Sequence, residues 1–401
     1  MAVTAPCSFL SLSLLLLLLL LLANGGGAST VEYQTLVLTP LQKPHALRDD
    51  YLLDETLVDS GAAREGESDL LSTTAAATSS LQVRVAHRDS ILASAAANST
   101  AEEILRLRLD RDAARVSYGD GSVTTGDFST ETLTFSSGAR VGRVALGCGH
   151  DNEGLFVAAA GLLGLGRGAL SFPSQAARRF GRRFSYCLVD RTSSSSSSSS
   201  AAPTPATPRT SSMVFGDAAA AATGPDAAFT PMVRNPKMET FYYVEVTGIS
   251  VGGSRVPATD LRLDPSTGRG GAIVDSGTSV TRLARAAYAA VRDAFRAGAA
   301  AGLGGEAAEV AGGFSLFDTC YDLAGRDEVR VPTVALHLAG GAQVSLPAEN
   351  YLIPVDTKGT FCFAFAGTDS GVSILGNIQQ QGFRVVFDGD RDRLGFVPKG
   401  C

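Results

Sequence analysis

The chain has 401 residues, a formal net charge of −6 and hydrophobic residues at 45% of its positions. This length leaves room for two domains with apolar cores, and the acidic balance, without any block of Lys or Arg, argues against nucleic acid as a partner. Only four histidines occur, they are scattered, and no Cys-x-x-Cys is present, so a zinc site is not expected.

The first predicted element is an apolar leader. Phe9–Ala23 is almost entirely Leu and Ser, and small residues follow it. One short apolar run at the N-terminus predicts a secretory signal over residues 1–28, cleaved between Ala23 and Ser29. The long Leu run and the lack of a preceding Lys or Arg leave a membrane anchor as the alternative. We expect the signal, and hence the secretory pathway with an extracellular (cell wall or apoplast) or vacuolar destination and no stable membrane partner after signal removal.

Residues 29–116 differ in composition from the rest of the chain. They are rich in Ala, Ser, Thr, Leu, Arg and acidic residues, and Ala101–Val116 has the spacing of a basic, partly amphipathic helix. We expect a removable pro-segment whose basic side chains cover an acidic cleft until activation, with a flexible linker as the alternative. Asn98 opens the one Asn-x-Ser/Thr sequence and is the expected glycosylation site.

From Ser117 onward the pattern is typical of β-structure. Helices are expected to be few and short, most clearly at Phe172–Phe180 and Ala284–Gly298. The Ser/Ala/Pro-rich stretch at 192–212, with its serine run Ser193–Ser200, predicts a disordered surface loop. Alternating apolar runs between Gly, Asp and Asn predict strands over Phe128–Phe135, Val141–Leu146, Phe241–Ile249, Val329–Leu338 and Arg384–Phe387.

Glycine turns mark the candidate functional residues. Tyr118-Gly-Asp-Gly-Ser122 has the glycine density of a tight hairpin, and its aromatic residue could close over a cleft. Ile273–Thr278 delivers Asp275 from an apolar strand into a glycine turn, where neighbouring hydroxyls can orient the carboxylate. Two other apolar strands end in glycine, at Leu162-Leu163-Gly164 and Ile374-Leu375-Gly376. A strand that carries Asp into a turn, braced by a second strand of this kind, is a specific arrangement.

These motifs, in this order, resemble the pepsin-like aspartic proteases, most closely the plant nepenthesin-like branch. The resemblance covers roughly Ser117 to Cys401, and Val83–Val116 is similar to the pro-segment of that branch. It rests on the stretches Ser117-Tyr-Gly-Asp-Gly-Ser with Gly126-Asp-Phe, Gly147-Cys-Gly-His-Asp-Asn, Gly161-Leu-Leu-Gly-Leu-Gly, Phe241-Tyr-Tyr-Val, Ile249-Ser-Val-Gly-Gly, Val274-Asp-Ser-Gly-Thr and Ile374-Leu-Gly-Asn.

The resemblance implies a mainly all-β, bilobal fold in which each lobe gives one Asp loop to a central cleft. Its N-terminal lobe, residues 117–232, would be incomplete, and residues 233–401 would form the C-terminal lobe. The implied activity is hydrolysis of an extended peptide or protein substrate by a carboxylate-activated water, in a monomer and without metal or organic cofactor. One carboxylate of such a pair is ionised and the other protonated, because like charges about 3 Å apart cannot ionise together.

The resemblance also assigns roles to individual residues. Asp275 is implied to be the catalytic Asp of the C-terminal lobe. The residues implied to assist it are Ser276, Gly277 and Thr278 in its loop, Tyr118 and Gly119 in the flap, and Ile374, Leu375 and Gly376 in the brace of the loop.

The chain departs from the family before the flap. There the family has a long segment with Asp-Thr-Gly-Ser, a Trp and several cysteines, whereas here Val116 runs directly into Ser117 and the chain contains no Trp. Leu162-Leu163-Gly164 would therefore brace a loop that is missing. Asp59-Ser60-Gly61 is a rival for the first Asp, but Ala, Ala, Arg and Glu follow it where a hydroxyl and an apolar strand are expected.

The cysteines fit an oxidising compartment. Cys7 falls in the signal, so an odd number of the six remains in the mature region. Cys320 and Cys362 are expected to pair and to close a loop worth roughly 4 kcal/mol. The resemblance implies a second pair, Cys187 with Cys401, and leaves Cys148 as a free thiol. Free thiols throughout are the alternative.

Three functions remain open from the sequence. The first is an aspartic endopeptidase by family that is inactive or impaired here, because a lone Asp cannot be acid and base at once. The second is a non-catalytic secreted peptide- or glycosidase-binding protein on the same scaffold, as cereal xylanase inhibitors are. The third is a non-functional truncated isoform. A homodimer that pairs two Asp275 side chains is conceivable, but the leftover N-terminal strands make it awkward.

Overall fold

The computed structural model describes the ranges 31–39, 81–85, 113–118, 121–135, 138–154, 161–189, 210–221, 224, 226–256, 261–304 and 309–401. Of 81–85, 113 and 114 only the backbone is described. The predicted signal, Asp59-Ser60-Gly61, Asn98, Gly119 and the serine run lie outside these residues.

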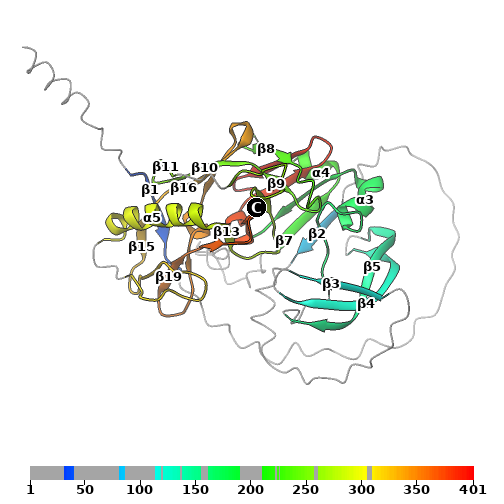
Figure 1. Cartoon of the computed structure of the whole chain (residues 1–401), viewed down its shortest axis with the longest axis horizontal. Coiled ribbons are helices and arrows are strands. Elements are labelled where there is room, and N and C mark those ends of the chain that lie inside the picture. The colour runs from blue at the N-terminus through cyan, green and yellow to red at the C-terminus, as the bar shows by residue number, and fades with distance from the viewer. Residues whose placement is uncertain are drawn as a thin grey trace, which may run out of the picture.

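The fold is mainly β, as the sequence predicts, and a large sheet runs through the middle of the molecule (Figure 1). Neighbouring strands within this sheet are mostly antiparallel. Two pairs near one end of the strand order, β12 with β21 and β13 with β20, are parallel. In order across the sheet the strands are β2 (Leu81–Val85), β7 (Ser211–Phe215), β6 (Arg183–Cys187), β22 (Arg384–Asp388), β23 (Arg393–Val397), β8 (Ala228–Val233), β9 (Tyr243–Val244), β12 (Ala272–Val274), β21 (Ser373–Leu375), β13 (Thr281–Ala284) and β20 (Phe365–Thr368).

Smaller sheets and a few helices surround this sheet. One sheet holds β11 (Ser254–Val256), β10 (Val246–Val251), β16 (Val334–Leu338) and β17 (Gln343–Leu346); others hold β14 (Cys320–Asp322), β19 (Thr360–Phe363) and β18 (Leu352–Pro354), then β3 (Ala113–Ser117), β4 (Val123–Thr134) and β5 (Arg140–Glu153), and finally the pair β1 (Tyr33–Val37) and β15 (Glu328–Pro332). The helices are α3 (Phe172–Phe180), α4 (Asp217–Ala221), α5 (Arg285–Gly302) and α6 (Asn377–Gln380), with 3-10 turns η3 (Ala339–Gly341) and η4 (Ala348–Asn350).

Helix α3 has the bounds that the sequence predicts, because its ends are encoded locally. Ser171 caps the first turn by accepting from the Ser174 N–H at 3.4 Å, and Gly181 follows the last turn with a φ of 69°. Helix α5 extends the predicted helix at its C-terminal end.

Three predictions need correction. The predicted helix Ala101–Val116 is wrong over its last residues, since Ala113–Ser117 is strand β3. The glycine turn after it brings β3 antiparallel to β4, and ladder pairing with β4 replaces the local helical preference. The predicted strand Phe241–Ile249 is split into β9 and β10, which enter different sheets. The predicted strand Val329–Leu338 is likewise split, at Thr333, into β15 and β16, which also enter different sheets.

Stacked aromatic rings pack in the buried core. Phe295 of α5 stacks on Phe363 with ring centroids 4.3 Å apart, and both side chains are fully buried. Phe184 of β6 stacks on Phe387 of β22 at 4.4 Å. The second contact joins a strand of the N-terminal lobe to one near the C-terminus, so the described parts of the two lobes share one core.

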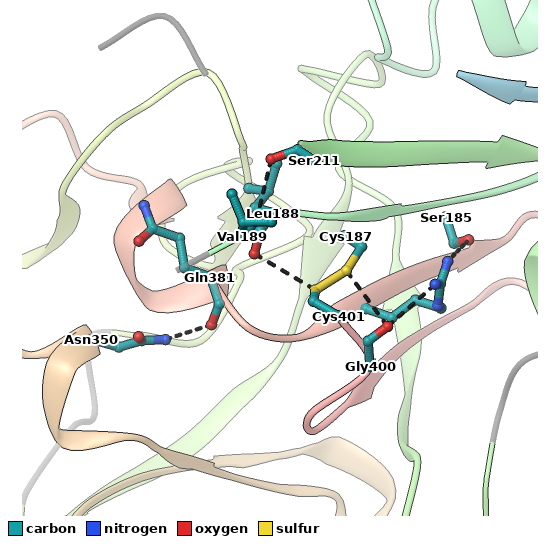
Figure 2. The surroundings of a disulfide bond; sticks show 10 residues. Ser185, Cys187, Leu188, Val189, Ser211, Asn350, Gln381, Gly400 and Cys401 are labelled. Atoms are coloured by element: carbon teal, nitrogen blue, oxygen red, sulfur yellow. Dashed lines mark hydrogen bonds between the residues drawn. A yellow bond between two sulfur atoms is a disulfide. The ribbon is translucent and has the colours of Figure 1, made fainter. Parts of the chain in front are cut away.

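Both expected disulfides are present. Cys187 of β6 and the terminal Cys401 are joined, as Figure 2 shows, with Gly400 and Leu188 beside them. Cys320 and Cys362 face each other across β14 and β19. Cys148 on β5 is exposed and carries no disulfide.

Candidate active site

Asp275 lies at the end of a buried strand. The three residues of β12 are all buried, and β12 runs parallel to β21 with Val274 opposite Leu375. The ladder continues into the turn, because the Asp275 N–H donates to the Leu375 carbonyl at 3.1 Å. The apolar run before Asp275 is thus held within the sheet. Asp275, which is half-buried, follows directly where β12 ends.

The loop after β12 orients the carboxylate. Asp275 Oδ1 accepts from the Gly277 N–H at 2.9 Å, and Oδ2 accepts from Thr278 Oγ1 at 2.7 Å. Hydrogen bonds to an ionised acceptor are roughly twice as strong as neutral ones. The structure therefore brings Asp275, Ser276, Gly277 and Thr278 together as one oriented loop.

Residues 374–378 support this loop through backbone hydrogen bonds. The Gly376 N–H donates to Thr281 Oγ1 at 2.9 Å, and the Asn377 N–H donates to the Thr278 carbonyl at 2.7 Å. A Cβ added at Gly376 would lie 2.6 Å from the Val280 carbonyl carbon. Glycine is needed here because two backbones approach more closely than any side chain allows.

Sequence reasoning missed the buried polar residues under the loop. Tyr186 of β6 donates from its hydroxyl to Gln380 Oε1, and Gln380 Nε2 donates to the Leu375 carbonyl at 2.8 Å. Gln379 Oε1 accepts from the Thr281 N–H at 3.1 Å. The sequence does contain an indication of these contacts, the mainly polar run Asn377–Gln381 directly after an apolar strand. Amide side chains that become buried next to a strand need hydrogen-bond partners.

The environment of Tyr186 favours the protonated, neutral form of its hydroxyl. Burial raises the pKa of its hydroxyl far above the ordinary value, the negative charge of Asp275 raises it further, and a hydrogen bond with Ser276 acts in the opposite direction. It follows that a strand of the N-terminal lobe places a permanent hydrogen-bond donor under the Asp275 loop.

The expected flap forms a hairpin. The Tyr118 N–H donates to the Ser122 carbonyl at 2.9 Å, and the Gly121 N–H donates to the Tyr118 carbonyl at 3.0 Å. Gly121 has a φ of 86°, which favours glycine. The hairpin belongs to the sheet β3–β4–β5, which is not hydrogen-bonded to the sheet that carries Asp275. Figure 1 shows it at one end of the molecule.

Comparison with known proteins decides the family. A model described as "Xylanase inhibitor N-terminal" matches residues 75–202, and one described as "Xylanase inhibitor C-terminal" matches residues 241–398. "Aspartyl protease family protein 2" of Arabidopsis thaliana is 61% identical over 290 residues, which cover 72% of this chain and 55% of that protein. "Aspartic proteinase nepenthesin-1" of Nepenthes gracilis is 36% identical over 288 residues, 71% of this chain and 60% of that one.

The chain belongs to the plant pepsin-like aspartic protease family. It spans about half the length of the curated relatives it matches. Solved structures agree on the fold: lupine conglutin gamma has a TM-score of 0.52 at 22% identity and covers 71% of this chain and 72% of its own, and edgp has 0.54 at 20% identity, with 80% and 83%.

Leu162-Leu163-Gly164, the other predicted brace, is exposed among the described residues. Leu162 and Leu163 are 58% and 43% exposed, whereas Leu375 of the intact brace is 2% exposed. A Cβ added at Gly164 would meet nothing within 4 Å. No described loop packs on Gly164 as the Val280 backbone packs on Gly376.

Other kinds of site find no support in the described part of the chain. Within it, no group of three or more His, Cys, Asp or Glu side chains could hold a metal ion. None of its helices combines the length and the apolar character needed to cross a membrane.

Proposed function

We propose that this chain carries the C-terminal half of an aspartic endopeptidase site and, as a single chain, does not hydrolyse peptide bonds. The observation that supports this most directly is the contrast between the two braces. A Cβ added at Gly376 would lie 2.6 Å from the Val280 carbonyl carbon, just after the Asp275 loop, whereas one added at Gly164 would have no contact within 4 Å among the described residues.

The chemistry follows from the single carboxylate. Hydrolysis needs one carboxylate to take a proton from water and a second, protonated group to polarise the peptide carbonyl. Asp275 can do one of these at a time, and both its oxygens are already oriented by its own loop. Losing one member of a catalytic unit lowers the rate by about 10⁴-fold or more. The substrate for the complete site would be an extended peptide.

Restoring the missing segment tests the proposal. The segment before the flap of the 61%-identical Arabidopsis relative would be inserted between Val116 and Ser117. We expect acid hydrolysis of a denatured protein to appear, to be blocked by a statine peptide and to be lost in Asp275→Ala. The matched control is the same insertion with its own catalytic Asp replaced by Asn. A restored chain that unfolds cooperatively as a monomer but hydrolyses nothing would refute the proposal.

A second candidate is a non-catalytic binding protein. Both family models that match carry descriptions of xylanase inhibitor domains. If this function holds, the purified chain will lower the activity of a glycoside hydrolase such as a xylanase, and Asp275→Ala will do so equally well. Unchanged xylanase activity at a large excess of the chain would remove that target.

A further inference from the structure

The segment Val31–Thr39, which falls in the region expected to be a removable pro-segment, is built into the C-terminal lobe. Strand β1 pairs antiparallel with β15 along its whole length, from Tyr33 opposite Pro332 to Val37 opposite Glu328. Figure 1 shows β1 beside β15 and α5, although β1 is far from both in the sequence.

Backbone hydrogen bonds extend beyond the strand on both sides. The Glu32 N–H donates to the Gly252 carbonyl at 3.0 Å, and the Glu32 carbonyl accepts from the Thr333 N–H at 3.0 Å. At the other end, the Leu38 N–H donates to the Asp327 carbonyl at 2.8 Å. The segment is therefore a full edge strand of this lobe, and it covers the ladder groups that β15 would otherwise expose.

Side chains of the segment alternate between the lobe and solvent. Leu36 is 4% exposed and Leu38 is also buried, while Val37 between them is 66% exposed. Alternation with one buried face fixes the register of a strand, because a slip of one residue would turn Leu36 outward.

Polar and aromatic contacts add specificity near the start of the strand. The Tyr33 hydroxyl donates to the Gly298 carbonyl at 3.1 Å, and the Arg330 guanidinium lies 4.9 Å from the centre of the Tyr33 ring. Gln34 Nε2 donates to the Leu346 carbonyl at 3.0 Å and to the Tyr351 hydroxyl at 2.5 Å.

Glycines of the lobe leave the space that the segment fills. A Cβ at Gly302 of α5 would lie 2.7 Å from Tyr33 Cε1, and also 2.3 Å from the Arg330 carbonyl oxygen. At Gly253, in the turn after β10, it would lie 2.7 Å from Glu32 Cδ. The lobe thus has an acceptor site shaped for an extended peptide.

We propose that Val31–Thr39 is a resident strand of the C-terminal lobe and stays bound when the chain that follows it is cut. The acceptor site takes an extended peptide with Tyr and Gln at its start and two alternating Leu residues after them. Cleavage within residues 40–80 would leave this peptide attached without a covalent link. Release of the downstream pro-segment would then not release its first residues.

The test uses the full chain with a specific protease recognition site placed between residues 60 and 70. After complete cutting, the N-terminal fragment should co-elute in native gel filtration with the rest of the chain, here called the body. It should separate from the body only in denaturant. Leu36→Asp should increase the rate at which the N-terminal fragment dissociates from the body at least 10-fold. Val37→Asp adds the same charge at the neighbouring exposed position and should retain the fragment far longer than Leu36→Asp does, with only a small loss because Asp would lie opposite Glu328.

A second measurement covers the case in which Leu36→Asp fails to fold. Labelled synthetic peptides of residues 31–39, either unchanged or carrying Leu36→Asp or Val37→Asp, are added to the cut wild-type chain. The unchanged and Val37→Asp peptides should exchange into the body, and the Leu36→Asp peptide should not. A native fragment that elutes free of the body, or equal behaviour of the two Asp peptides, would overturn the proposal. No readout depends on hydrolytic activity.

Discussion

At the scale of single residues, Gly376 and Gly164 differ in how closely other parts of the chain pack against them. Gly376 has an ordinary φ of −83°, so backbone strain does not explain the need for glycine there. The need comes from the Val280 backbone, which would lie 2.6 Å from an added Cβ. Gly164 follows the same apolar-apolar pattern in sequence, but a Cβ added to it would have no neighbour within 4 Å.

Substituting Ala at each position measures this difference. Gly376→Ala should lower the free energy of unfolding by about 1–3 kcal/mol, as overpacking does. Gly164→Ala should change it by less than about 0.5 kcal/mol. Urea denaturation of both variants gives the comparison. Equal losses would mean that the first brace is packed after all.

Asp388 provides a test that depends on pH. Its side chain is buried, and Oδ2 accepts from Arg391 at 3.0 Å and from Arg393 at 3.1 Å. Burial acts to raise the pKa of Asp388, but the hydrogen bonds from the two Arg side chains outweigh it, and the pKa lies below the ordinary 3.8. Because the folded-state pKa is the lower one, the ionised form stabilises the fold above about pH 4, and this contribution is lost as pH falls through the folded-state pKa.

Asp388→Asn should therefore cost about 1–3 kcal/mol of unfolding free energy at pH 7. The difference from wild type should shrink as pH falls below about 4, because the carboxylate of the unfolded wild-type chain takes up a proton there before the folded one does. Thermal unfolding of both proteins across this range is the measurement. A gap that stays constant from pH 7 to pH 3 would show that the charge of Asp388 is not what stabilises the contact.

At the scale of elements, strand β6 supports the Asp275 loop through Tyr186. Tyr186→Phe removes the donor to Gln380 Oε1, which is buried, so unfolding free energy should fall by about 1–3 kcal/mol. Tyr242→Phe is the matched control, because the hydrogen bond from the Tyr242 hydroxyl to the Gly166 carbonyl is long, at 3.4 Å. Chemical denaturation should show the larger loss in Tyr186→Phe, and the reverse order would contradict this role.

Elements with local signals could be predicted from the sequence, and elements that depend on distant partners could not. Helix α3 carries its own cap at Ser171 and its own stop at Gly181. Strand β1 has an alternating pattern, but nothing near it in sequence names β15 as its partner. Ala113–Val116 has helical spacing and still forms β3, because a hairpin partner lies just beyond the turn.

The same division applies to the candidate site. The Asp275 loop and its Ile374-Leu375-Gly376 brace could be predicted, since glycine and hydroxyl residues mark turns and orient carboxylates. The hydrogen bonds that involve Tyr186, Gln379 and Gln380 could not, because they join residues about 100 or more positions apart that meet only after folding.

At the scale of the whole molecule, the Cys187–Cys401 disulfide links residues 214 positions apart. Replacing both with Ser should lower stability by about 2–5 kcal/mol, mainly because the unfolded chain gains freedom. Cys148→Ser, at an exposed cysteine without a disulfide, should leave the melting temperature unchanged. Melting curves without reductant compare the two. If Cys148→Ser destabilises as much as the double variant, the structural role belongs to Cys148 instead.

The most direct measurement is the hydrolysis of a denatured protein by the purified chain between about pH 3 and pH 6, beside Asp275→Ala. With only one carboxylate in the site, we expect the two proteins to give the same background rate, with no effect of a statine peptide. Hydrolysis by the unaltered chain that the statine peptide blocks and Asp275→Ala abolishes would show that a working carboxylate pair exists.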